Sequence, residues 1–446
     1  SWVDEFIENV RPYIFVRTED NLLIKRPNQA QKLNHQGALI LKHLLDGNSV
    51  SGVLQQIAHE PARIQHVADF LRAVREFLEH GLDVNTVHPA VEVTPFDRHF
   101  SSLPILSEIA ITYKCNLRCV FCYAGCNCTT QPVDDNREMT VAEIKRVLNR
   151  LYHQGKVPSV SFTGGEPTLR KELPELVAYA TQLGMRVNLI TNGTRVTAAL
   201  AAELADAGLS SAQVSLEGSS EITHNRVTQG NTSFKRTVAA VGHFRQAGIR
   251  VHTNTTINRI NLHEMPDMPG FVRRELGNQR FIMNLLVPTG SAMVHPDLIV
   301  RYRDIGPWLE RIKTRSREQD VEFMWYSPTP MCMFNPITAG LGNHGCSACD
   351  GLISIAPNGD LIPCASYDDS LGNLLQTDMP TLWNSHRAKG YRDKALAHPQ
   401  CRQCDQFDIC NGACPLYWRE MGFDELEQLN GFDAAPARRT VDHTQE

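Results

Sequence analysis

The sequence predicts an α/β fold: a partial (β/α)6 TIM barrel, with a winged-helix-like α+β domain before it and a loop-rich domain after it. Three observations predict this arrangement. Apolar runs of strand length alternate with helix-length segments between about residues 105 and 310, and repeated β–α units indicate a parallel sheet with right-handed crossovers. A hairpin pattern and three helical patterns fill the first 85 residues. Turns and cysteines dominate the last third.

Composition places the chain among ordinary folded proteins. Its 446 residues are 42% hydrophobic and 21% charged, which is not typical of disorder. The net charge of −5 argues against non-specific nucleic-acid binding, so we expect no nucleic-acid partner. No stretch approaches the roughly 18 apolar residues that a membrane-spanning helix needs, so we expect no membrane association.

The 13 cysteines are strongly clustered. Five lie between Cys115 and Cys128, seven lie between Cys346 and Cys414, and Cys332 stands apart. In a long chain, such clustering is more typical of metal or iron–sulfur ligation in a reducing compartment than of structural disulfides. We therefore expect a cytoplasmic protein.

Residues 1–85 predict a small α+β unit. Two apolar strands, 13–17 and 22–25, flank a polar turn, and helical patterns follow over 36–45, 50–58 and 64–78, the last closed by Gly81. Winged-helix units often bind DNA, but residues 1–95 carry more acidic than basic side chains, the wrong balance for phosphate contacts. A small sheet with an open edge can instead hold an extended peptide by strand addition.

The barrel is predicted from six strands, over residues 108–112, 159–163, 186–191, 212–216, 250–256 and 280–286. The helices between them have start and stop signals, which we place at Thr140 with Glu143 to Gly155, Thr168 to Gly184, Thr197 to Gly208, and Ser233 to Gly248. Six repeats are too few for a closed eight-fold barrel. In such folds the chemistry lies at the carboxyl ends of the strands.

The strongest motif, Cys115-x3-Cys119-x2-Cys122, directly follows the first of these strands. Three thiolates on one short loop can bind three irons of a cubane cluster, which leaves the fourth iron without a protein ligand. A zinc site is the alternative, because Cys126 or Cys128 offers a fourth ligand. We assign Cys126 and Cys128 no role.

A second motif, Gly164-Gly165-Glu166, ends the next strand. Paired glycines let backbone approach a ligand closely, and the carboxylate of Glu166 suits an ammonium group.

Together these residues resemble the radical S-adenosylmethionine (radical SAM) enzymes. The resemblance implies a [4Fe-4S] cluster on Cys115, Cys119 and Cys122, whose open iron binds S-adenosylmethionine. It further implies cleavage to a 5′-deoxyadenosyl radical that abstracts a substrate hydrogen, and an electron donor such as flavodoxin or ferredoxin. The residues it points to for the S-adenosylmethionine pocket are Gly164, Gly165, Glu166, Asn192, Ser215 and Arg226.

The C-terminal cysteines exceed what one four-ligand site can use, which favours two clusters. A hairpin of residues 353–355 and 361–362 is expected to present Cys364. The spacing resembles the SPASM domain of some radical SAM enzymes. That resemblance implies two auxiliary clusters, the first on Cys346, Cys349, Cys364 and Cys414, and the second on Cys401, Cys404 and Cys410.

The second auxiliary cluster lacks its usual fourth thiolate, because no cysteine follows Cys414. Four side chains remain open as replacements: Asp424, Glu425, Glu427 and Cys332. Otherwise the cluster is three-coordinate or has two irons. Zinc is the competing interpretation for this region.

The first 80 residues resemble the chaperone of pyrroloquinoline quinone biosynthesis and related PqqD-like peptide-recognition domains. The resemblance rests on Lys32-Leu33-Asn34, Gly37, and Leu45-Asp46-Gly47. It implies that this domain holds the leader segment of a ribosomally made precursor peptide.

The predicted domains are a PqqD-like unit over 1–85, a linker over 86–104, the radical SAM barrel over 105–310, a bridging region over 311–345, the SPASM domain over 346–422, and a partly disordered tail over 423–446. The favoured function is maturation of a precursor peptide by a cross-link, a thioether or epimerisation. One alternative is a radical SAM/SPASM enzyme acting on a folded protein or a small metabolite. Another is a zinc-stabilised winged-helix regulator.

Overall fold

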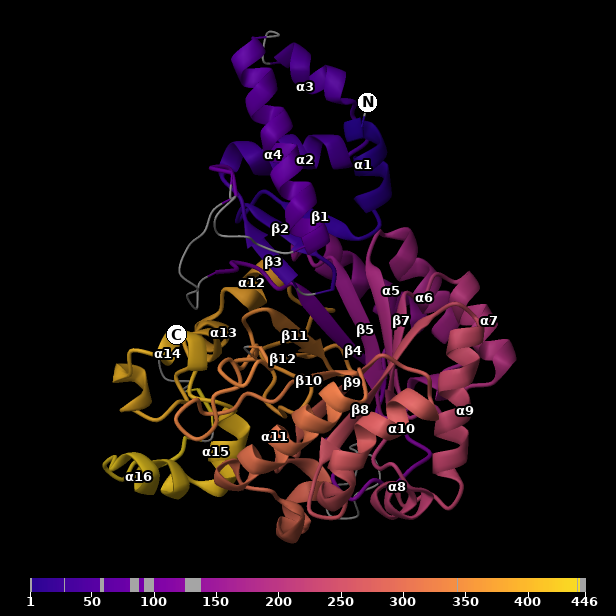
Figure 1. Cartoon of the computed structure of the whole chain (residues 1–446), viewed down its shortest axis with the longest axis vertical. Helices are drawn as coiled ribbons and strands as arrows, with labels where there is room; N and C mark the ends of the chain where they lie inside the picture. The colour runs from indigo at the N-terminus through magenta and orange to yellow at the C-terminus, as the bar shows by residue number, and fades with distance from the viewer. Residues whose placement is uncertain are drawn as a thin grey trace.

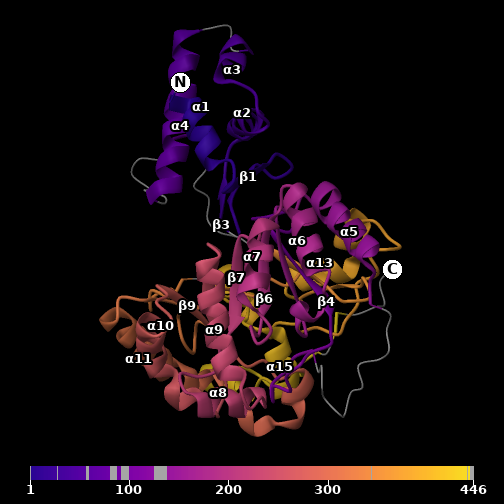
Figure 2. The same ribbon diagram turned by 90° about the vertical axis from the view of Figure 1, so that its right-hand side faces the viewer.

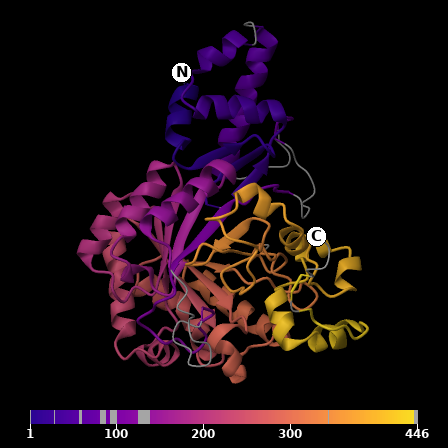
Figure 3. The same ribbon diagram turned by 180° about the vertical axis from the view of Figure 1, so that it is seen from behind.

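The computed structural model describes residues 2–27, 29–56, 60–80, 88–91, 100–124, 138–342, 344–438 and 440–441. An N-terminal domain stands at one end of a large sheet, and the C-terminal region packs beside that sheet (Figure 1). The view from behind shows the same three parts, with the C-terminal helices to one side of the strands (Figure 3). Among the residues within these ranges, no helix is both long enough and apolar enough to cross a membrane.

The N-terminal domain combines a small antiparallel sheet with four helices. Its elements are α1 (Trp2–Val10), β1 (Ile14–Arg17), β2 (Leu22–Lys25), β3 (Gln29–Lys32), α2 (His35–Leu45), α3 (Val50–Gln56) and α4 (Pro61–His80). The predicted hairpin and three helices are confirmed. The closing glycine predicted at Gly81 and the end of the second helix lie outside the described residues.

Two elements of this domain were not predicted. The sequence of β3 (Gln-Ala-Gln-Lys) has no apolar alternation, and the strand exists because its backbone pairs with β2. Helix α1 buries Val3, Phe6 and Ile7 in the domain core. Both elements depend on tertiary neighbours that a local pattern does not show.

A nine-stranded sheet forms the centre of the molecule, in the order β10-β9-β8-β7-β6-β5-β4-β11-β12. The six predicted strands are present and parallel: β4 (Leu106–Thr112), β5 (Ser159–Gly164), β6 (Arg186–Thr191), β7 (Ser211–Ser215), β8 (Arg250–Ile257) and β9 (Arg280–Leu285). The predicted fold class, a partial α/β barrel with a small domain at either end of the chain, is confirmed. The carboxyl ends of the six strands share one edge.

Three further strands extend the sheet beyond the prediction. β10 (Glu322–Trp325) pairs in parallel with β9, and its Trp325 is fully buried. The predicted hairpin is present as β11 (Leu352–Ile355) and β12 (Leu361–Ile362), but β11 also pairs in parallel with β4. The C-terminal region is therefore continuous with the barrel sheet.

Helices cover one face of the sheet, where α6, α7 and α9 lie side by side (Figure 2). The helices that follow the barrel strands are α5 (Val141–Asn149), α6 (Leu173–Gln182), α7 (Ala198–Asp206), α8 (Glu221–Thr228), α9 (Ser233–Gln246), α10 (Met268–Arg274) and α11 (Tyr302–Glu318). The predicted capping box is present, with the side chains of Thr140 and Glu143 each bonded to the other's backbone N–H. The helix predicted to start at Thr168 begins instead at Leu173, because Thr168 lies in a short 3₁₀ turn and bonds to Glu166.

The C-terminal region carries short helices between its cysteines: α12 (Met379–Trp383), α13 (His386–Arg392), α14 (Phe407–Cys410), α15 (Pro415–Met421) and α16 (Asp424–Asn430). The last of these lies in the predicted tail. We expected residues 423–446 to be partly disordered, but 424–430 form a helix that buries Glu425 and Leu426. Its sequence is polar, so only its packing reveals it.

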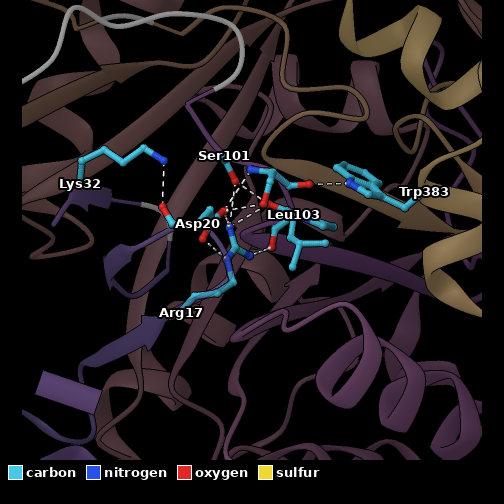
Figure 4. A network of polar contacts seen from close by, with 8 residues as sticks. Arg17, Asp20, Lys32, Ser101, Leu103 and Trp383 are labelled. Carbon is cyan, nitrogen blue, oxygen red and sulfur yellow. Dashed lines mark hydrogen bonds and ion pairs between the residues drawn. The ribbon is translucent and has the colours of Figure 1, made fainter. Parts of the chain in front are cut away.

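A buried polar network joins the N-terminal domain to the barrel (Figure 4). The Arg17 guanidinium forms a two-pronged ion pair with Asp20, 2.8 Å at each contact, and donates to the Pro104 carbonyl oxygen at 2.8 Å. It also donates to Ser101 Oγ at 2.9 Å. The indole N–H of Trp383 in the C-terminal region donates to the Ser102 carbonyl oxygen at 2.8 Å, so all three parts of the chain meet here.

Candidate active site

The loop that carries Cys115, Cys119 and Cys122 follows β4 at the carboxyl edge of the sheet. Its backbone is fixed from two sides. On one side, Val120 N–H donates to the Val227 carbonyl oxygen at the end of α8, at 3.0 Å. On the other side, the Cys122 carbonyl oxygen accepts from Ser291 N–H at 2.9 Å, from the segment after β9. The loop is thus held by elements distant in sequence.

The three sulfur atoms lie close enough to influence one another. Burial raises the pKa of the Cys115 thiol to about 11, and the neighbouring Cys122 thiol adds to this rise. Burial also raises the pKa of Cys119 well above its ordinary value, and Cys122 and Cys115 contribute. Thiols in such surroundings stay protonated unless a bound cation stabilises the thiolate.

This donor set fits an iron–sulfur cluster. Three cysteines on one loop are the ligands that such clusters take. Within the described ranges, no group of three or more His, Cys, Asp or Glu side chains has the geometry to hold a single metal ion. Each thiolate of a cubane binds a separate iron, so the sulfurs need not converge on one point.

The glycine pair after β5 brings two backbones together. A Cβ atom on Gly164 would lie 2.1 Å from the Thr112 carbonyl oxygen, and one on Gly165 would lie 2.4 Å from the Lys114 carbonyl oxygen. We expected the pair to permit approach of a ligand. In the structure the glycine pair permits close approach of the segment that leads from β4 into the cysteine loop. Gly165 N–H donates to the carbonyl oxygen of Thr112, the last residue of β4, at 2.8 Å.

Glu166 is fully buried at the edge of the sheet. Its Oε1 accepts from Thr168 N–H at 3.0 Å and from the Thr191 hydroxyl at 2.7 Å, and its Oε2 accepts from Asn192 N–H at 2.8 Å. Burial raises the pKa of this carboxyl, and these hydrogen bonds oppose the rise. The carboxylate joins the ends of β5 and β6, and Oε2 retains acceptor capacity for a ligand.

The structure brings together some of the other predicted pocket residues. Asn192 lies beside the cysteine loop, with its Nδ2 3.9 Å from Cys115 Sγ and 3.1 Å from Asn116 Oδ1. Ser215 is half-buried at the carboxyl end of β7. Arg226 lies on α8, next to the residue that holds the loop, but it is exposed. The role of each in binding S-adenosylmethionine stays a prediction.

Glu217 was missed by the sequence analysis. It is buried two residues beyond Ser215, and its Oε2 accepts from Thr256 N–H at 2.9 Å. Burial raises its pKa to about 8, and its charge in turn raises the pKa of Cys119. Its N–H donates to Nδ1 of the buried His224 at 3.0 Å. The signal was present in the Val-Ser-Leu-Glu-Gly turn, where only the serine was singled out.

The C-terminal cysteines fall into two groups. In the first, the Cys346 and Cys414 thiols add to the rise that burial causes in the pKa of Cys364. The Cys346 thiol likewise adds to the burial-driven rise in the pKa of Cys349, to about 12. These four residues are those predicted for the first auxiliary cluster. Their ligation of one cluster remains an expectation.

The second group contains Cys401, Cys404 and Cys410. Burial raises the pKa of Cys401 to about 12, and the thiols of Cys410 and Cys404 contribute. Cys332 contributes as well. Cys126 and Cys128 lie outside the described residues.

A parallel sheet with three half-buried cysteines at its carboxyl edge, and two further groups of cysteines beside it, defines an iron–sulfur enzyme of the barrel class. The family model for the radical SAM superfamily matches residues 109–271, and the model for the SPASM iron–sulfur cluster-binding domain matches residues 346–405. The chain belongs to the radical SAM superfamily. It is an enzyme, and its cofactors are S-adenosylmethionine and iron–sulfur clusters.

Two of the similar proteins act on different kinds of substrate. An Fe-coproporphyrin III synthase from Methanosarcina barkeri is 34% identical over 332 residues, which are 68% of this chain and 81% of that protein. A PqqA peptide cyclase from Bradyrhizobium diazoefficiens is 28% identical over 334 residues, which are 70% of this chain and 81% of that protein.

Among solved structures, SuiB from Streptococcus suis bound to its precursor peptide SuiA has the same fold. The TM-score is 0.67 at 16% identity, over 91% of this chain and 95% of SuiB. Such coverage leaves about 40 residues of this chain unmatched. The N-terminal domain contains more residues than this, so part of it must also match SuiB.

Proposed function

We propose that this enzyme is a peptide maturase. It abstracts a hydrogen from a ribosomally made precursor peptide and installs a cross-link, a thioether or an epimerised centre. When bound, the cluster and S-adenosylmethionine supply the hydrogen-abstracting radical, with electrons from a donor such as flavodoxin or ferredoxin. The residues of the chain place the substrate and exclude water.

The proposal rests on the N-terminal domain. This domain is fixed to the barrel, and β3 is an edge strand of its small sheet. Within the described residues, β3 itself pairs with β2 alone, and just beyond its end Leu33 forms an antiparallel bridge with Val91. Leu33 N–H donates to the Asn21 carbonyl oxygen at 2.8 Å, and ladder bonds alternate along an antiparallel pair. The N–H and C=O groups of Ala30 therefore face away from β2, before the bridge to Val91, and an extended leader can pair with them there.

Fixed docking gives this strand a role in positioning. The Arg17 network holds the N-terminal sheet against residues 101–104, which lead directly into β4 and the cysteine loop. A leader bound at β3 would raise the local concentration of the core peptide at the barrel. SuiB, which has the same fold and was solved with a precursor peptide bound, supports a precursor peptide as the partner.

The proposal is tested by an anaerobic reaction of the reduced enzyme, S-adenosylmethionine and a short peptide encoded next to the enzyme. A loss of two hydrogens indicates a cross-link or thioether, and uptake of one deuterium in heavy water indicates epimerisation. Ala30→Pro removes an outward N–H without breaking a bond to β2, so it should weaken leader binding at least tenfold. Ala30→Ser keeps that N–H and serves as the control. Equal leader affinity in the two variants would contradict strand addition.

A second candidate function follows from the similarity to an Fe-coproporphyrin III synthase. In that case the substrate is a tetrapyrrole, and the N-terminal domain is structural. The reduced enzyme with S-adenosylmethionine, supplied with an iron tetrapyrrole precursor instead of the peptide, should then form Fe-coproporphyrin III or heme, and it should leave every peptide unchanged.

A further inference from the structure

Cys332 lies in a tight turn after β10 that reaches the second group of C-terminal cysteines. The Pro330 carbonyl oxygen accepts from Met333 N–H at 2.9 Å and from Phe334 N–H at 3.1 Å, which closes the turn. Met331 N–H donates to Cys410 Sγ at 3.4 Å. The backbone next to Cys332 therefore contacts a cysteine that is 79 positions further along the chain.

The Cys332 side chain belongs to the same group. The Cα of Cys332 is about 3.8 Å from that of Met331, the residue whose N–H contacts Cys410 Sγ. The turn therefore brings the Cys332 thiol next to the segment that carries Cys401, Cys404 and Cys410.

Two of the three carboxylates that compete for the fourth position are engaged elsewhere. Buried Glu425 accepts from the Tyr417 hydroxyl and, at 3.2 Å, from Arg303 N–H. Glu427 Oε1 accepts from Ala435 N–H at 2.8 Å and lies 3.4 Å from His398 Nε2. Asp424 is exposed at the start of α16.

A side chain of α16 instead binds Cys332. Asn430 Nδ2 donates to the Leu426 carbonyl oxygen at 2.8 Å and lies 3.5 Å from Cys332 Sγ, so it donates to the sulfur as well. An amide donor of this kind stabilises a metal-bound thiolate and orients it. The helix thereby positions Cys332 and does not itself supply a ligand.

We propose that Cys332 is the fourth protein ligand of the second auxiliary iron–sulfur cluster, beside Cys401, Cys404 and Cys410. The segment between barrel and SPASM domain then supplies the thiolate that the C-terminal end of the chain lacks. With four protein thiolates, every iron of a cubane at this site has a ligand. The site has no vacant position for substrate, which confines it to electron transfer. The inference rests on the cluster assignment and is independent of the peptide substrate.

The first test isolates the auxiliary clusters. A Cys115→Ala/Cys119→Ala/Cys122→Ala background should bind about eight irons when both auxiliary clusters are cubanes. In this background, Cys332→Ala should leave one iron of the second auxiliary cluster without a protein ligand. Added imidazole should then change the electron paramagnetic resonance spectrum of the reduced protein, and mild oxidation should release about one iron per chain. Asp424→Asn and Glu427→Gln are the matched controls, and their spectra should not respond to imidazole. A Cys332→Ala spectrum that imidazole leaves unchanged at full iron content, or a response in either carboxylate variant, would overturn the proposal.

The second test uses the native chain, so that it does not depend on how well a variant folds. Cys332 is exposed, so iodoacetamide can reach its thiol when the thiol is not bound to iron. In the iron-loaded protein, mass mapping should find Cys332 unlabelled, and removal of iron by a chelator should make it at least tenfold more reactive. Complete labelling of Cys332 while all iron is retained would show that it is not a ligand.

Discussion

Replacing Arg17 with alanine should destabilise the contact between the N-terminal domain and the barrel. The Arg17 side chain is 0% exposed and that of Asp20 is 5% exposed, at a contact distance of 2.8 Å. Breaking a buried ion pair from one side costs about 3–5 kcal/mol, because it leaves a charge unpaired. Asp20 keeps bonds from the Ser102 N–H and hydroxyl, at 3.0 and 3.1 Å, so we expect a loss near the lower limit, about 3 kcal/mol.

The assay is urea unfolding of the iron-loaded full chain. Arg63→Ala is the matched control, because Arg63 forms an ion pair with Glu60 in the same domain but is 61% exposed. Exposed pairs contribute about 0–1 kcal/mol, so this variant should resemble the unmodified enzyme. A double-mutant cycle with Asp20→Ala separates the pair from the other contacts of Arg17 and should give a coupling energy of about 2 kcal/mol.

The Arg17→Ala variant also tests whether fixed docking of the N-terminal domain on the barrel is needed for function. If fixed docking positions the leader, Arg17→Ala should lower peptide modification more than it lowers leader affinity. An Arg17→Ala enzyme whose free energy of unfolding lies within about 0.5 kcal/mol of the Arg63→Ala control would refute the reasoning, because surface substitutions already fall in that range.

Three further predictions concern the site. Gly165→Ala places a Cβ 2.4 Å from a backbone oxygen and should reduce iron at the cluster on Cys115, Cys119 and Cys122 by at least half. Gly242→Ala, which has open space around its Cβ, should bind iron normally, and equal iron content in the two variants would contradict the close approach. Cys115→Ala should lower the total from about twelve irons to about eight and abolish cleavage of S-adenosylmethionine, measured as 5′-deoxyadenosine release; release at the unmodified rate would contradict the assignment. Burial lowers the pKa of His224 to about 4 from 6.5. Between pH 6.5 and pH 4 the unfolded chain therefore binds a proton at this histidine that the folded chain does not, and the free energy of unfolding falls as the pH falls through this window. Between pH 7 and pH 5 this amounts to about 2 kcal/mol, and urea unfolding of His224→Gln should show a correspondingly smaller loss.

Local sequence signals predicted much of the fold. Thr140 with Glu143 marked a helix start through bonds within one turn, and the structure confirms it. The barrel strands were found as short segments rich in apolar and β-branched residues between helical patterns, although β6 and β8 also carry several polar side chains. The cysteine loop was equally visible, since all three thiols lie within one short segment that follows a strand.

Other features were decided by contacts that no local pattern contains. β11 pairs with β4 although about 240 residues separate them, and β3 exists only through its ladder with β2. Thr168 has the features of a helix cap, yet it bonds to Glu166 because the buried carboxylate needs donors.

The sequence by itself determined the chemistry of this protein, because the spacing of cysteines on a single loop suffices to define a cluster-binding site. Only the tertiary structure decided how the distant parts complete one another. It carries Cys332 toward three cysteines far along the chain, and it joins the N-terminal sheet to the barrel through contacts that include the buried guanidinium of Arg17. Such partners are chosen by packing and by the need to pair buried polar groups, and these are properties of the folded chain as a whole.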